Sequence, residues 1–462
     1  MSFDPASFKG RKAAVIGLGR SGIACARLLC RKGFKVFGTD SRPRKELAGS
    51  LSRMGRGFSW EGGRHTDRAL SCAFAVKSPG LSPSLPLLQR MAQRGIPVFS
   101  ELEVALAFCK AGEVIAITGT NGKTTTTALV AQIFKAGSRP GRKVRVCGNI
   151  GLPASAVALE TGSKDTVVLE VSSYQLEDSR YFRPNAAALL NITADHLDHH
   201  GGMDRYLDAK ARVFEDQRPE DLCVFNAGDP LTLKISRDCG SRRLFFGPKG
   251  GPAHAWVEKG MIRVSGVTRR PLSLRPPKLP GAHNLENSMA AALLALGRGV
   301  KPAAVQKAFR SFKGVEHRLE EVGVIRGLRC VNDSKATNVD STLVALKALE
   351  DEKGRILLIL GGLHKGSPYS PLRPLVAERV KGIFTIGSAA RKIEEDLSGS
   401  TSIFPCGELK IAIETAFQIG SPGDLLLLSP ACASFDQFKD FEDRGRRFKE
   451  LVSAQVRSRL KP

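Results

Sequence analysis

The sequence predicts an α/β protein made of three segments, each a mainly parallel sheet covered by helices. Short apolar runs alternate with helical patterns along the 462 residues, which is the order expected of parallel strands joined by helices. Glycine-rich turns follow two of these runs, as in nucleotide-binding folds. At about 150 residues per domain the length suggests three domains, and we place them at 1–101, 102–314 and 315–462.

The composition is that of a globular chain, with 42% hydrophobic and 25% charged residues. No apolar stretch is long enough to cross a bilayer, and the N-terminus lacks a basic region followed by an apolar one. We therefore expect a cytoplasmic protein without a membrane partner. Ten cysteines without a C-x-x-C pair indicate reduced thiols and argue against a zinc ribbon.

The net charge of +25 raises the possibility of nucleic acid as a partner. Basic residues are spread along the chain, with only short clusters such as Arg444, Arg446 and Arg447, and aromatic residues make up 6%. This distribution argues against a nucleic-acid partner. A basic surface also suits an anionic phosphorylated substrate, and an ordinary solvated surface explains the charge equally well.

The first segment begins as a βαβ unit. An apolar run, Lys12–Ile16, is followed by G-L-G-R-S-G at 17–22, a helical pattern, and a second strand from Phe34 that ends at Asp40. This fingerprint normally predicts NAD. The turn requires only a pyrophosphate at a helix start, so a UDP-sugar fits as well. With an ATP loop downstream, we favour UDP; glycines that serve only close packing remain the alternative.

The middle segment opens with the apolar run Glu113–Ile117 and the string T-G-T-N-G-K-T-T at 118–125. A strand, a glycine-rich turn and a helix start direct backbone N–H groups at one point, where Lys123 adds a positive charge. Such a point binds phosphate. The spacing differs from G-x-x-x-x-G-K-[ST], because Ile117 stands where the first glycine should be.

Within this loop, Gly119 and Gly122 allow the backbone to approach an anion closely. Thr124 or Thr125 can place a hydroxyl on a phosphate-bound magnesium ion. A turn without a ligand is the less favoured alternative.

Further apolar runs predict the remaining strands and helices. Predicted strands lie at 167–170, 186–192, 222–226, 356–360, 382–386 and 424–428, and predicted helices at 84–93, 101–109 and from 203 onward. The proline-rich stretch 271–280 is predicted to be a loop. The third segment starts near Val315.

Two groups of side chains suggest a metal site. Glu170 ends an apolar strand, where a carboxylate usually faces the ligand crevice and suits magnesium; the alternative is an N-cap or a solvated strand end. The string D-H-L-D-H-H at 195–200 taken alone suggests a transition metal, but the ATP loop favours magnesium or manganese. His196 is the candidate ligand, whereas we interpret His199 and His200 as surface-loop residues.

Lys210 lies on an apolar stripe. The predicted helix from Met203 places Tyr206, Leu207 and Phe214 on one face, and Lys210 falls on that face. A lysine that points inward has a lowered pKa, so its amine can capture carbon dioxide as a carbamate. An amphipathic lysine whose head reaches water is an equally good interpretation of the periodicity.

Several polar strings follow other predicted strands or start a helix. They are G-A-H-N-L-E-N at 281–287, H-R at 317–318, N-D-S-K-A-T-N at 332–338, G-G-L-H-K at 361–365 and S-P-A-C-A-S-F-D-Q-F at 429–438. The first, at a helix start, is suited to a purine or a phosphate. Each taken alone is also compatible with ordinary turn chemistry.

Together these strings resemble the Mur ligases, whose shortened ATP loop G-T-N-G-K-T is shared with folylpolyglutamate synthases. The resemblance runs from Gly17 to about Arg447, and its most specific pieces are N-D-S-K-A-T-N and S-P-A-C-A-S-F-D-Q-F. It implies a Rossmann-like N-terminal domain that binds UDP, a central P-loop-type ATPase domain and a Rossmann-like C-terminal domain that binds glutamate. It also implies ATP, two Mg²⁺ ions with Mn²⁺ as a substitute, a cytoplasmic location and a monomer.

The reaction implied by this resemblance is the ATP-dependent addition of D-glutamate to UDP-N-acetylmuramoyl-L-alanine through an acyl phosphate, in peptidoglycan precursor synthesis. Another Mur ligase or a folylpolyglutamate-synthase-like enzyme is the alternative within the family. A nucleic-acid-binding ATPase and an NAD-dependent oxidoreductase are the alternatives from other classes, and no hydride-transfer site accompanies the first glycine turn.

The resemblance also implies roles for individual residues. Nucleotide binding falls on Gly119, Thr120, Asn121, Gly122, Lys123, Thr124, Thr125, Asn284, Asn287, Arg318 and Asp333. The metal ligands would be Thr124, Glu170, His196 and a carbamylated Lys210, and the catalytic residues Lys123, His196, Lys210 and Arg318. Substrate binding falls on Ser21, Asp40 and Ser41 for UDP, Asn149 for the muramoyl part, and Lys335, Thr337, Lys365, Ser434 and Phe441 for glutamate. Arg20 and Ala194 depart from the family pattern, which favours an apolar residue and an acid there.

Overall fold

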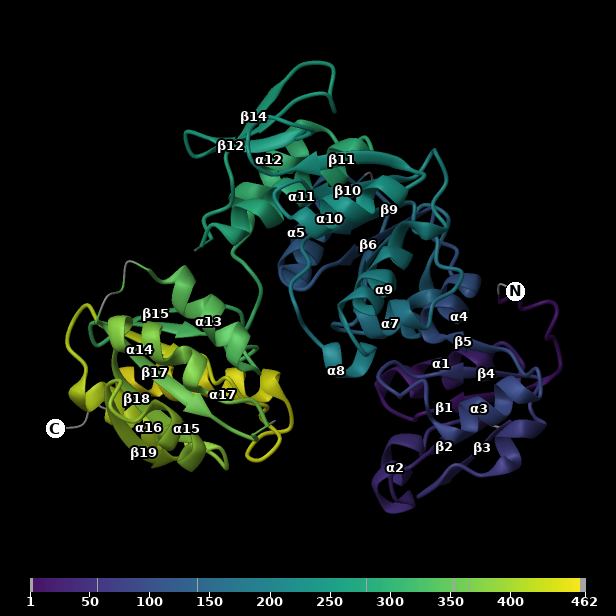
Figure 1. Cartoon of the computed structure of the whole chain (residues 1–462), viewed down its shortest axis with the longest axis horizontal. Coiled ribbons are helices and arrows are strands. Elements are labelled where there is room, and N and C mark those ends of the chain that lie inside the picture. The colour runs from purple at the N-terminus through teal and green to yellow at the C-terminus, as the bar shows by residue number, and fades with distance from the viewer. Residues whose placement is uncertain are drawn as a thin grey trace. The chain divides into compact units, whose positions relative to one another are not determined.

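The computed structural model describes residues 3–55, 57–138, 140–279, 281–350, 352, 354–364 and 366–457. The chain divides into two compact units, Met1–Pro277 with His283–Phe312 and Lys278–Ala282 with Lys313–Pro462. The described residues form three sheets, two in the first unit and one in the second (Figure 1). The predicted α/β class is confirmed, and the boundaries of the three predicted domains stay a prediction.

The first sheet has five parallel strands in the order β3-β2-β1-β4-β5. The strands are β1 (Lys12–Ile16), β2 (Lys35–Asp40), β3 (Phe58–Gly62), β4 (Phe74–Lys77) and β5 (Val98–Ser100). The helices are α1 (Arg20–Arg31), α2 (Arg44–Leu51), α3 (Pro86–Gln93) and α4 (Glu101–Phe108). The predicted βαβ unit is confirmed, and β1 and β2 lie side by side with the glycine turn at their carboxyl ends.

The second sheet has nine strands in the order β14-β13-β12-β11-β10-β9-β6-β8-β7. They are β6 (Glu113–Thr118), β7 (Val144–Gly148), β8 (Thr166–Glu170), β9 (Ala186–Leu189), β10 (Leu222–Asn226), β11 (Arg242–Phe246), β12 (Ala255–Glu258), β13 (Met261–Val264) and β14 (Leu272–Leu274). Strands β6 to β11 pair in parallel, as do β11 and β12, whereas β12 with β13 and β13 with β14 pair antiparallel. The prediction of a loop over 271–280 is therefore wrong at Leu272–Leu274, which pairs with β13.

Helices cover the second sheet because its central strands are apolar on both faces. The helices are α5 (Lys123–Gly137), α6 (Ala154–Val157), α7 (Ser173–Glu177), α8 (Leu197–His200), α9 (Met203–Glu215), α10 (Pro230–Ile235), α11 (His283–Gly297) and α12 (Pro302–Ser311). Ala116 of β6 shares a core with Tyr206 and Val213 of α9, while α5 packs against α11 and α12. The start of α5 and the side of α9 therefore both lie beside the end of β6.

The third sheet has six strands in the order β15-β16-β20-β17-β18-β19. They are β15 (Glu320–Ile325), β16 (Leu328–Asn332), β17 (Ile356–Gly361), β18 (Val380–Ile386), β19 (Ser402–Gly407) and β20 (Leu425–Leu428). Only the pairing of β15 with β16 is antiparallel among these strands. The helices are α13 (Val339–Ala348), α14 (Arg373–Arg379), α15 (Ala390–Leu397), α16 (Leu409–Ile419) and α17 (Phe441–Arg457).

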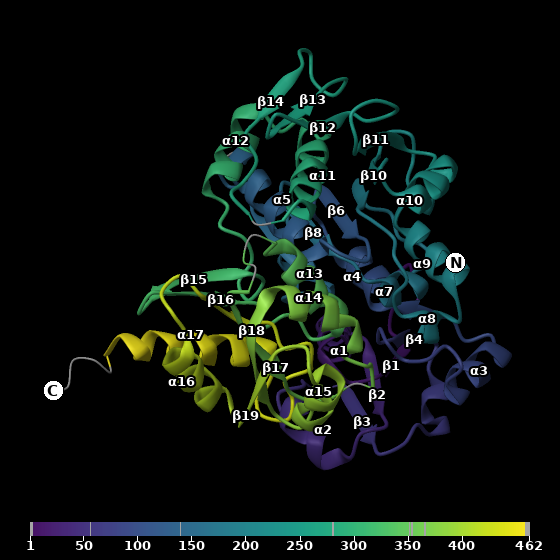
Figure 2. The same cartoon turned by 60° about the vertical axis from the view of Figure 1, so that its left-hand side comes forward.

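Alternation along β17 explains why helices lie on both faces of the third sheet (Figure 2). Leu358 shares a core with Val376 of α14 and Ile393 of α15, whereas Leu357 and its neighbours on the other face pack with α16 and α17. A strand that is apolar at every position is buried on both sides.

Polar contacts join the first and second sheets within the first unit. Lys77 at the end of β4 forms an ion pair of 2.6 Å with Asp178, and the Glu101 carboxylate accepts the backbone N–H of Ser155 at 2.6 Å. The Arg20 guanidinium donates to the Gly151 carbonyl at 2.5 Å. These contacts place the two glycine turns on one framework.

The cysteines and the apolar character of the helices were also predicted from the sequence. All ten cysteines lie in the described part of the chain and carry free thiols. Among the described helices, none has the length and apolar character required to span a bilayer.

Candidate active site

The phosphate-loop candidate, residues 118–125, joins β6 to α5. Gly122 adopts a left-handed conformation with φ of 82° as the N-cap of α5, and Gly119 has φ of 148°. A Cβ at Gly122 would overlap the Asn287 side-chain oxygen, and one at Gly119 would lie 3.0 Å from Leu190 Cβ. Both positions therefore require glycine, and the loop places the start of α5 at the end of the strand.

Two side chains from other elements hold the loop in place. Asn191, just past β9, accepts the Asn121 N–H at 2.8 Å, and its backbone carbonyl accepts the Thr120 N–H at 2.9 Å. The hydroxyls of Thr120 and Tyr206 lie 2.9 Å apart. The sequence analysis missed the role of Asn191, although its place directly after an apolar strand was a usable signal.

Lys123 and Lys210 converge on one carbonyl oxygen. The Gly119 carbonyl accepts hydrogen bonds from Lys123 Nζ at 3.0 Å and from Lys210 Nζ at 2.9 Å, and Lys123 also donates to Thr120 O at 2.8 Å. Lys210 is only 1% exposed, which confirms that it points inward. Burial, and then the charge of Lys123, lower the pKa of Lys210 well below its usual value.

Glu170 ends β8, next to β6 in the sheet, and is 1% exposed. Its Oε1 accepts a hydrogen bond from Asn149 Nδ2 at 2.9 Å, and its Oε2 has no hydrogen-bond partner among the described residues. A solvated strand end is therefore the wrong interpretation of Glu170. Ser172 forms the N-cap of α7 together with Gln175, so the capping role belongs to Ser172, and a Glu170 oxygen remains for a cation.

His196 is the N-cap of α8, with a positive φ of 54°. Its Nε2 lies 3.4 Å from an Asp195 oxygen, and its ring contacts Tyr174 with centroids 4.9 Å apart. Burial lowers the pKa of His196; Asp195 opposes this, and the charges of Lys123 and Lys210 add to it. A neutral imidazole beside the two lysines is suited to bind a metal ion.

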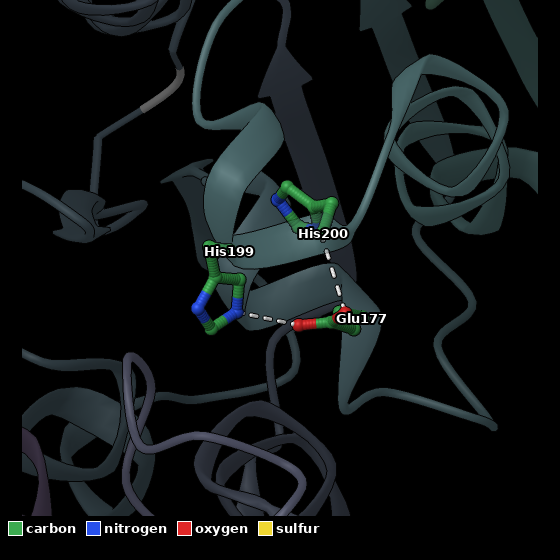
Figure 3. Close-up of side chains that lie close together, drawn as sticks. All are labelled: Glu177, His199 and His200. Atoms are coloured by element: carbon green, nitrogen blue, oxygen red, sulfur yellow. Dashed lines mark hydrogen bonds and ion pairs between the residues drawn. The ribbon is translucent and has the colours of Figure 1, made fainter.

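The prediction that His199 and His200 are surface-loop residues is wrong. Both belong to α8, and His200 is 2% exposed. They contact Glu177, at the end of α7, from two sides (Figure 3). The sequence analysis missed Glu177 because nothing in its local pattern shows that α8 packs beside it.

A cavity of about 250 Å³ lies where the first glycine turn meets the second sheet. Its lining includes Arg20, Ser21, Ser78, Asn149 and Gln175. It brings together two of the predicted substrate residues, Ser21 and Asn149. Asp40 and Ser41 are not among the described residues that line this cavity.

Asp40 supports the first glycine turn. Its oxygens accept the N–H of Leu18 at 2.6 Å and that of Arg42 at 2.9 Å, and it pairs with the Arg42 guanidinium at 2.9 Å. Burial alone would raise the pKa of Asp40, but the hydrogen bonds from Arg42 and Leu18 outweigh it and hold the pKa below its usual value. This contact was not foreseen.

Asn284 and Asn287 lie in the first turns of α11, beside α5. Asn287 Oδ1 accepts from the Thr126 hydroxyl at 3.2 Å, and its Nδ2 donates to Asn284 Oδ1 at 3.1 Å. These predicted nucleotide contacts therefore adjoin the phosphate loop. Thr124 and Thr125 in the first turn of α5 are each 5% exposed.

The second unit contains the other predicted site residues, near the ends of β16 and β20. Asp333 accepts from Ser429 Oγ at 2.8 Å and from the Leu319 N–H, next to Arg318, at 3.2 Å. Burial raises the pKa of Asp333 to about 6, against the opposing charge of Arg318. Lys335 Nζ lies 5.7 Å from the centre of the Phe441 ring.

Three more predicted glutamate contacts belong to the same loops. The Thr337 N–H donates to Lys335 O at 2.9 Å, and Ser434 is 2% exposed, with its carbonyl accepting from Phe438. Lys365 lies outside the described residues.

Arg444, which the sequence places in a short basic cluster, is buried and 0% exposed. Its guanidinium donates to Ser334 O at 2.9 Å and Cys432 O at 3.1 Å, and at 3.4 Å to both Gly361 O and Ala433 O. Burial lowers its pKa to about 10. Arg444 therefore holds three of the predicted loops together.

The comparisons with known proteins agree with this arrangement. Three family models match: the N-terminal domain of MurD-like Mur ligases at residues 11–100, the Mur ligase middle domain at 117–295, and the glutamate ligase domain of Mur ligases at 317–432. The UDP-N-acetylmuramoylalanine–D-glutamate ligase of Elusimicrobium minutum is 45% identical, over 98% of this chain and 100% of the relative. That of Koribacter versatilis is 42% identical, over 96% and 97%.

The chain belongs to the Mur ligase family, in the branch of the UDP-N-acetylmuramoylalanine–D-glutamate ligases. Solved structures share its fold at low identity. The UDP-N-acetylmuramate–alanine ligase of Thermotoga maritima has a TM-score of 0.57 at 21% identity, covering 96% of this chain and 99% of that one. MurF of Acinetobacter baumannii has a TM-score of 0.60 at 16% identity, covering 97% of each.

Proposed function

We propose that this protein is an ATP-dependent amide-bond ligase that adds D-glutamate to UDP-N-acetylmuramoyl-L-alanine in peptidoglycan precursor synthesis. The observation that carries the proposal is the phosphate-type loop at β6–α5, where Lys123 and Lys210 share the Gly119 carbonyl, with the unpaired Glu170 oxygen at the end of the neighbouring strand β8. The full-length similarity to D-glutamate ligases defines the substrates.

The chemistry needs activation because a carboxylate resists attack by an amine. The L-alanine carboxylate first takes the γ-phosphoryl group of ATP, which releases ADP and forms an acyl phosphate. The neutral amine of D-glutamate then attacks the acyl carbon. The tetrahedral intermediate collapses with phosphate as the leaving group, and a proton leaves the amine as the amide forms.

Lys123 and the loop bind and orient the ATP phosphates. The start of α5 adds its positive end, and Gly119 and Gly122, which carry no side chain, let phosphate oxygens approach the backbone N–H groups. Placed where negative charge shifts during phosphoryl transfer, Lys123 stabilises the transition state.

Glu170, Thr124 and His196 fit a magnesium site. A buried carboxylate oxygen without a partner and a buried hydroxyl in the first turn of α5 are the oxygen donors that Mg²⁺ prefers. His196 adds a neutral imidazole, which Mn²⁺ would accept as well. When bound, the two ions would act as Lewis acids on the phosphoryl oxygens.

Lys210 would bind the second ion as a carbamate. Two ammonium groups on one carbonyl oxygen repel each other, so the buried Lys210 favours a neutral amine that can react with carbon dioxide. The product is an anion beside Lys123, which turns repulsion into attraction and supplies a metal ligand.

The remaining roles complete the proposal. Ser21 and Asn149 contact the UDP-muramoyl substrate through the 250 Å³ cavity, with Asp40 and Ser41 on the UDP side. Asn284 and Asn287 bind adenine, and Arg318 and Asp333 contact the γ-phosphate and the ribose. Lys335, Thr337, Ser434, Phe441 and Lys365 hold glutamate. The protein acts as a cytoplasmic monomer.

One assay tests the proposal. Purified protein is incubated with UDP-N-acetylmuramoyl-L-alanine, ATP and Mg²⁺ and with single amino acids, including both enantiomers of glutamate, while ADP release is measured. ADP release that depends on D-glutamate is expected. Turnover with another amino acid or acceptor would favour a different Mur ligase or a folylpolyglutamate-type activity, and absence of turnover with every combination would refute the proposal.

A further inference from the structure

Glu177, His199 and His200 form a cluster that the ligase reaction does not use. His199 Nε2 lies 2.8 Å from Glu177 Oε2, and His200 Nδ1 lies 3.3 Å from Glu177 Oε1. One donor atom from each of the three residues falls within 4.8 Å of the other two. Figure 3 shows both imidazoles directed at the carboxylate.

The spacing is close to that of a tetrahedral metal site. Zinc lies about 2.0–2.2 Å from imidazole nitrogen and carboxylate oxygen, so neighbouring donors in such a site are roughly 3.3 Å apart. His199 Nε2 and His200 Nδ1 lie 2.8 and 3.3 Å from the two different oxygens of Glu177, and one donor atom from each of the three residues lies within 4.8 Å of the others, so small side-chain rotations bring the three donors to this spacing. Two imidazoles and one carboxylate are a zinc donor set with a fourth position for water.

The hydrogen bonding of His200 also fits a metal ligand. Its Nε2 lies 3.0 Å from the Ser173 hydroxyl, which is buried in the first turn of α7. With the proton on Nε2 donated to Ser173, the Nδ1 lone pair faces the Glu177 carboxylate, an arrangement that a cation between them stabilises. Metal-bound histidines typically donate their second N–H to such a partner.

The cluster is mostly buried, but one side of it is open to solvent. The side chains of His200, His199 and Glu177 are 0%, 16% and 21% exposed. The carboxylate and His200 are thus partly desolvated, which strengthens binding to a cation, while the His199 side leaves an entry path.

A second cluster with similar composition provides a contrast. Glu316, His317 and Glu320 also lie close together. There Lys449 Nζ already pairs with both carboxylates, at 2.6 and 2.9 Å, and His317 Nδ1 lies 2.9 Å from the Asn332 amide. The Lys449 ammonium group already neutralises these carboxylates, so we do not propose a metal site there.

We propose that Glu177, His199 and His200 bind a zinc-class transition-metal ion at a site separate from the magnesium ligands. The ion links the end of α7 to α8. Because His196 is the N-cap of α8 and α7 begins three residues after Glu170, the bound metal fixes the two segments that carry Glu170 and His196. The site shares no residue with either magnesium position.

The test is metal binding in the absence of ATP and substrates, so its outcome does not depend on the ligase activity. Chelator-treated full-length protein is titrated with Co²⁺, read by the visible absorption of tetrahedral cobalt, and with Zn²⁺ in competition. One ion per chain is expected. His199→Gln and Glu177→Gln should weaken Zn²⁺ binding by more than about 100-fold, and Ser173→Ala by about 10- to 100-fold, as for loss of an outer partner.

His254→Gln is the matched control, since His254 directly precedes β12 and its Nδ1 accepts the Phe245 N–H, and this variant should bind Zn²⁺ as the unaltered chain does. Should His200→Gln fail to fold by circular dichroism, the more exposed His199 variant still decides. Unchanged binding in His199→Gln and Glu177→Gln, loss of binding in His196→Ala alone, or no binding in the unaltered chain would each overturn the proposal.

Discussion

The two glycine-rich turns of the first unit have the same strand–turn–helix order and different charged partners. In the turn after β1, Asp40 accepts the Leu18 N–H and Arg20 is directed away to the Gly151 carbonyl. In the turn after β6, Lys123 and Lys210 both lie on the Gly119 carbonyl. A carboxylate from β2 therefore supports the first turn, and two amines, one of them from α9, lie at the second.

The glycines of the two turns also serve different purposes. A Cβ at Gly22 would overlap the Gly17 carbonyl oxygen, so this glycine allows α1 to pack onto its own strand. Gly122 instead supplies a left-handed N-cap, and a Cβ there would overlap the Asn287 side chain, which is hydrogen-bonded to Thr126 and Asn284. A glycine pattern predicts the turn, and the neighbouring charges decide which anion it can hold.

The largest effect on activity is expected from removing Lys123, the cation of the second turn. Lys123→Ala is expected to lower ATP-dependent phosphate release by more than about 1,000-fold, since an electrostatic contact to the transferring phosphoryl group is lost. The measurement is ADP formation at saturating substrates. Lys135→Ala, an exposed lysine on the same helix, serves as the control, and near-normal turnover of Lys123→Ala would contradict the assignment.

Lys210→Ala tests whether the second amine at the Gly119 carbonyl is needed for activity. We expect activity to fall by about 100-fold or more, because a ligand of the second metal ion is removed. If the lysine acts as a carbamate, added acetate or formate should restore part of the activity. Lys307→Ala on α12 is the control and should show neither effect. Full activity of Lys210→Ala without carboxylates would rule out the carbamate.

Gly22→Ala tests the packing role of the first turn. The added methyl group meets backbone that cannot move aside, so we expect a loss of about 2 kcal/mol in the free energy of unfolding. Urea denaturation followed by circular dichroism measures it. Gly19→Ala, where a Cβ has no described atom within 4 Å, should unfold at nearly the same urea concentration as the unaltered chain; an equal loss in both variants would argue against close packing at Gly22.

The smallest expected effect concerns the carboxylate of the first turn. Because the folded pKa of Asp40 is depressed, its contribution is present above the unfolded pKa of about 3.9 and is lost as pH falls through the folded value. Asp40→Asn should therefore destabilise the protein by about 1 kcal/mol at pH 7, a modest value since Arg42 is half exposed.

The difference between Asp40→Asn and the unaltered chain should shrink as pH falls below about 4. Urea unfolding at several pH values measures this trend, with the exposed Asp208→Asn as control. A difference that stays constant across pH would show that the Asp40 charge does not support the turn.

Much of the fold was predictable because local patterns coincide with the elements. The apolar run at 222–226 and the helix from Met203 were located to the residue, and the stripe on that helix predicted the burial of Lys210 correctly. The antiparallel strands β12 to β14 were not foreseen, because β14 is only Leu272–Leu274 between prolines and depends on its neighbour for hydrogen bonds.

The parts of the site that could not be predicted depend on contacts between distant residues. Glu177 has an ordinary helical context, and only the packing of α8 brings two histidines to it. The sequence places Arg444 in a basic run, although its guanidinium is surrounded by loop carbonyls. Periodicity reports which face of an element is buried, and it does not report which element covers that face.

The carbonyl shared by Lys123 and Lys210 implies a trade-off between function and durability. A buried amine that is desolvated and repelled by its neighbour weakens the folded state, and replacing such a group by an apolar one of similar size often strengthens it. Lys210→Met should therefore melt at a higher temperature than the unaltered chain while working poorly as an enzyme. Selection for heat resistance alone would therefore favour an apolar residue at position 210.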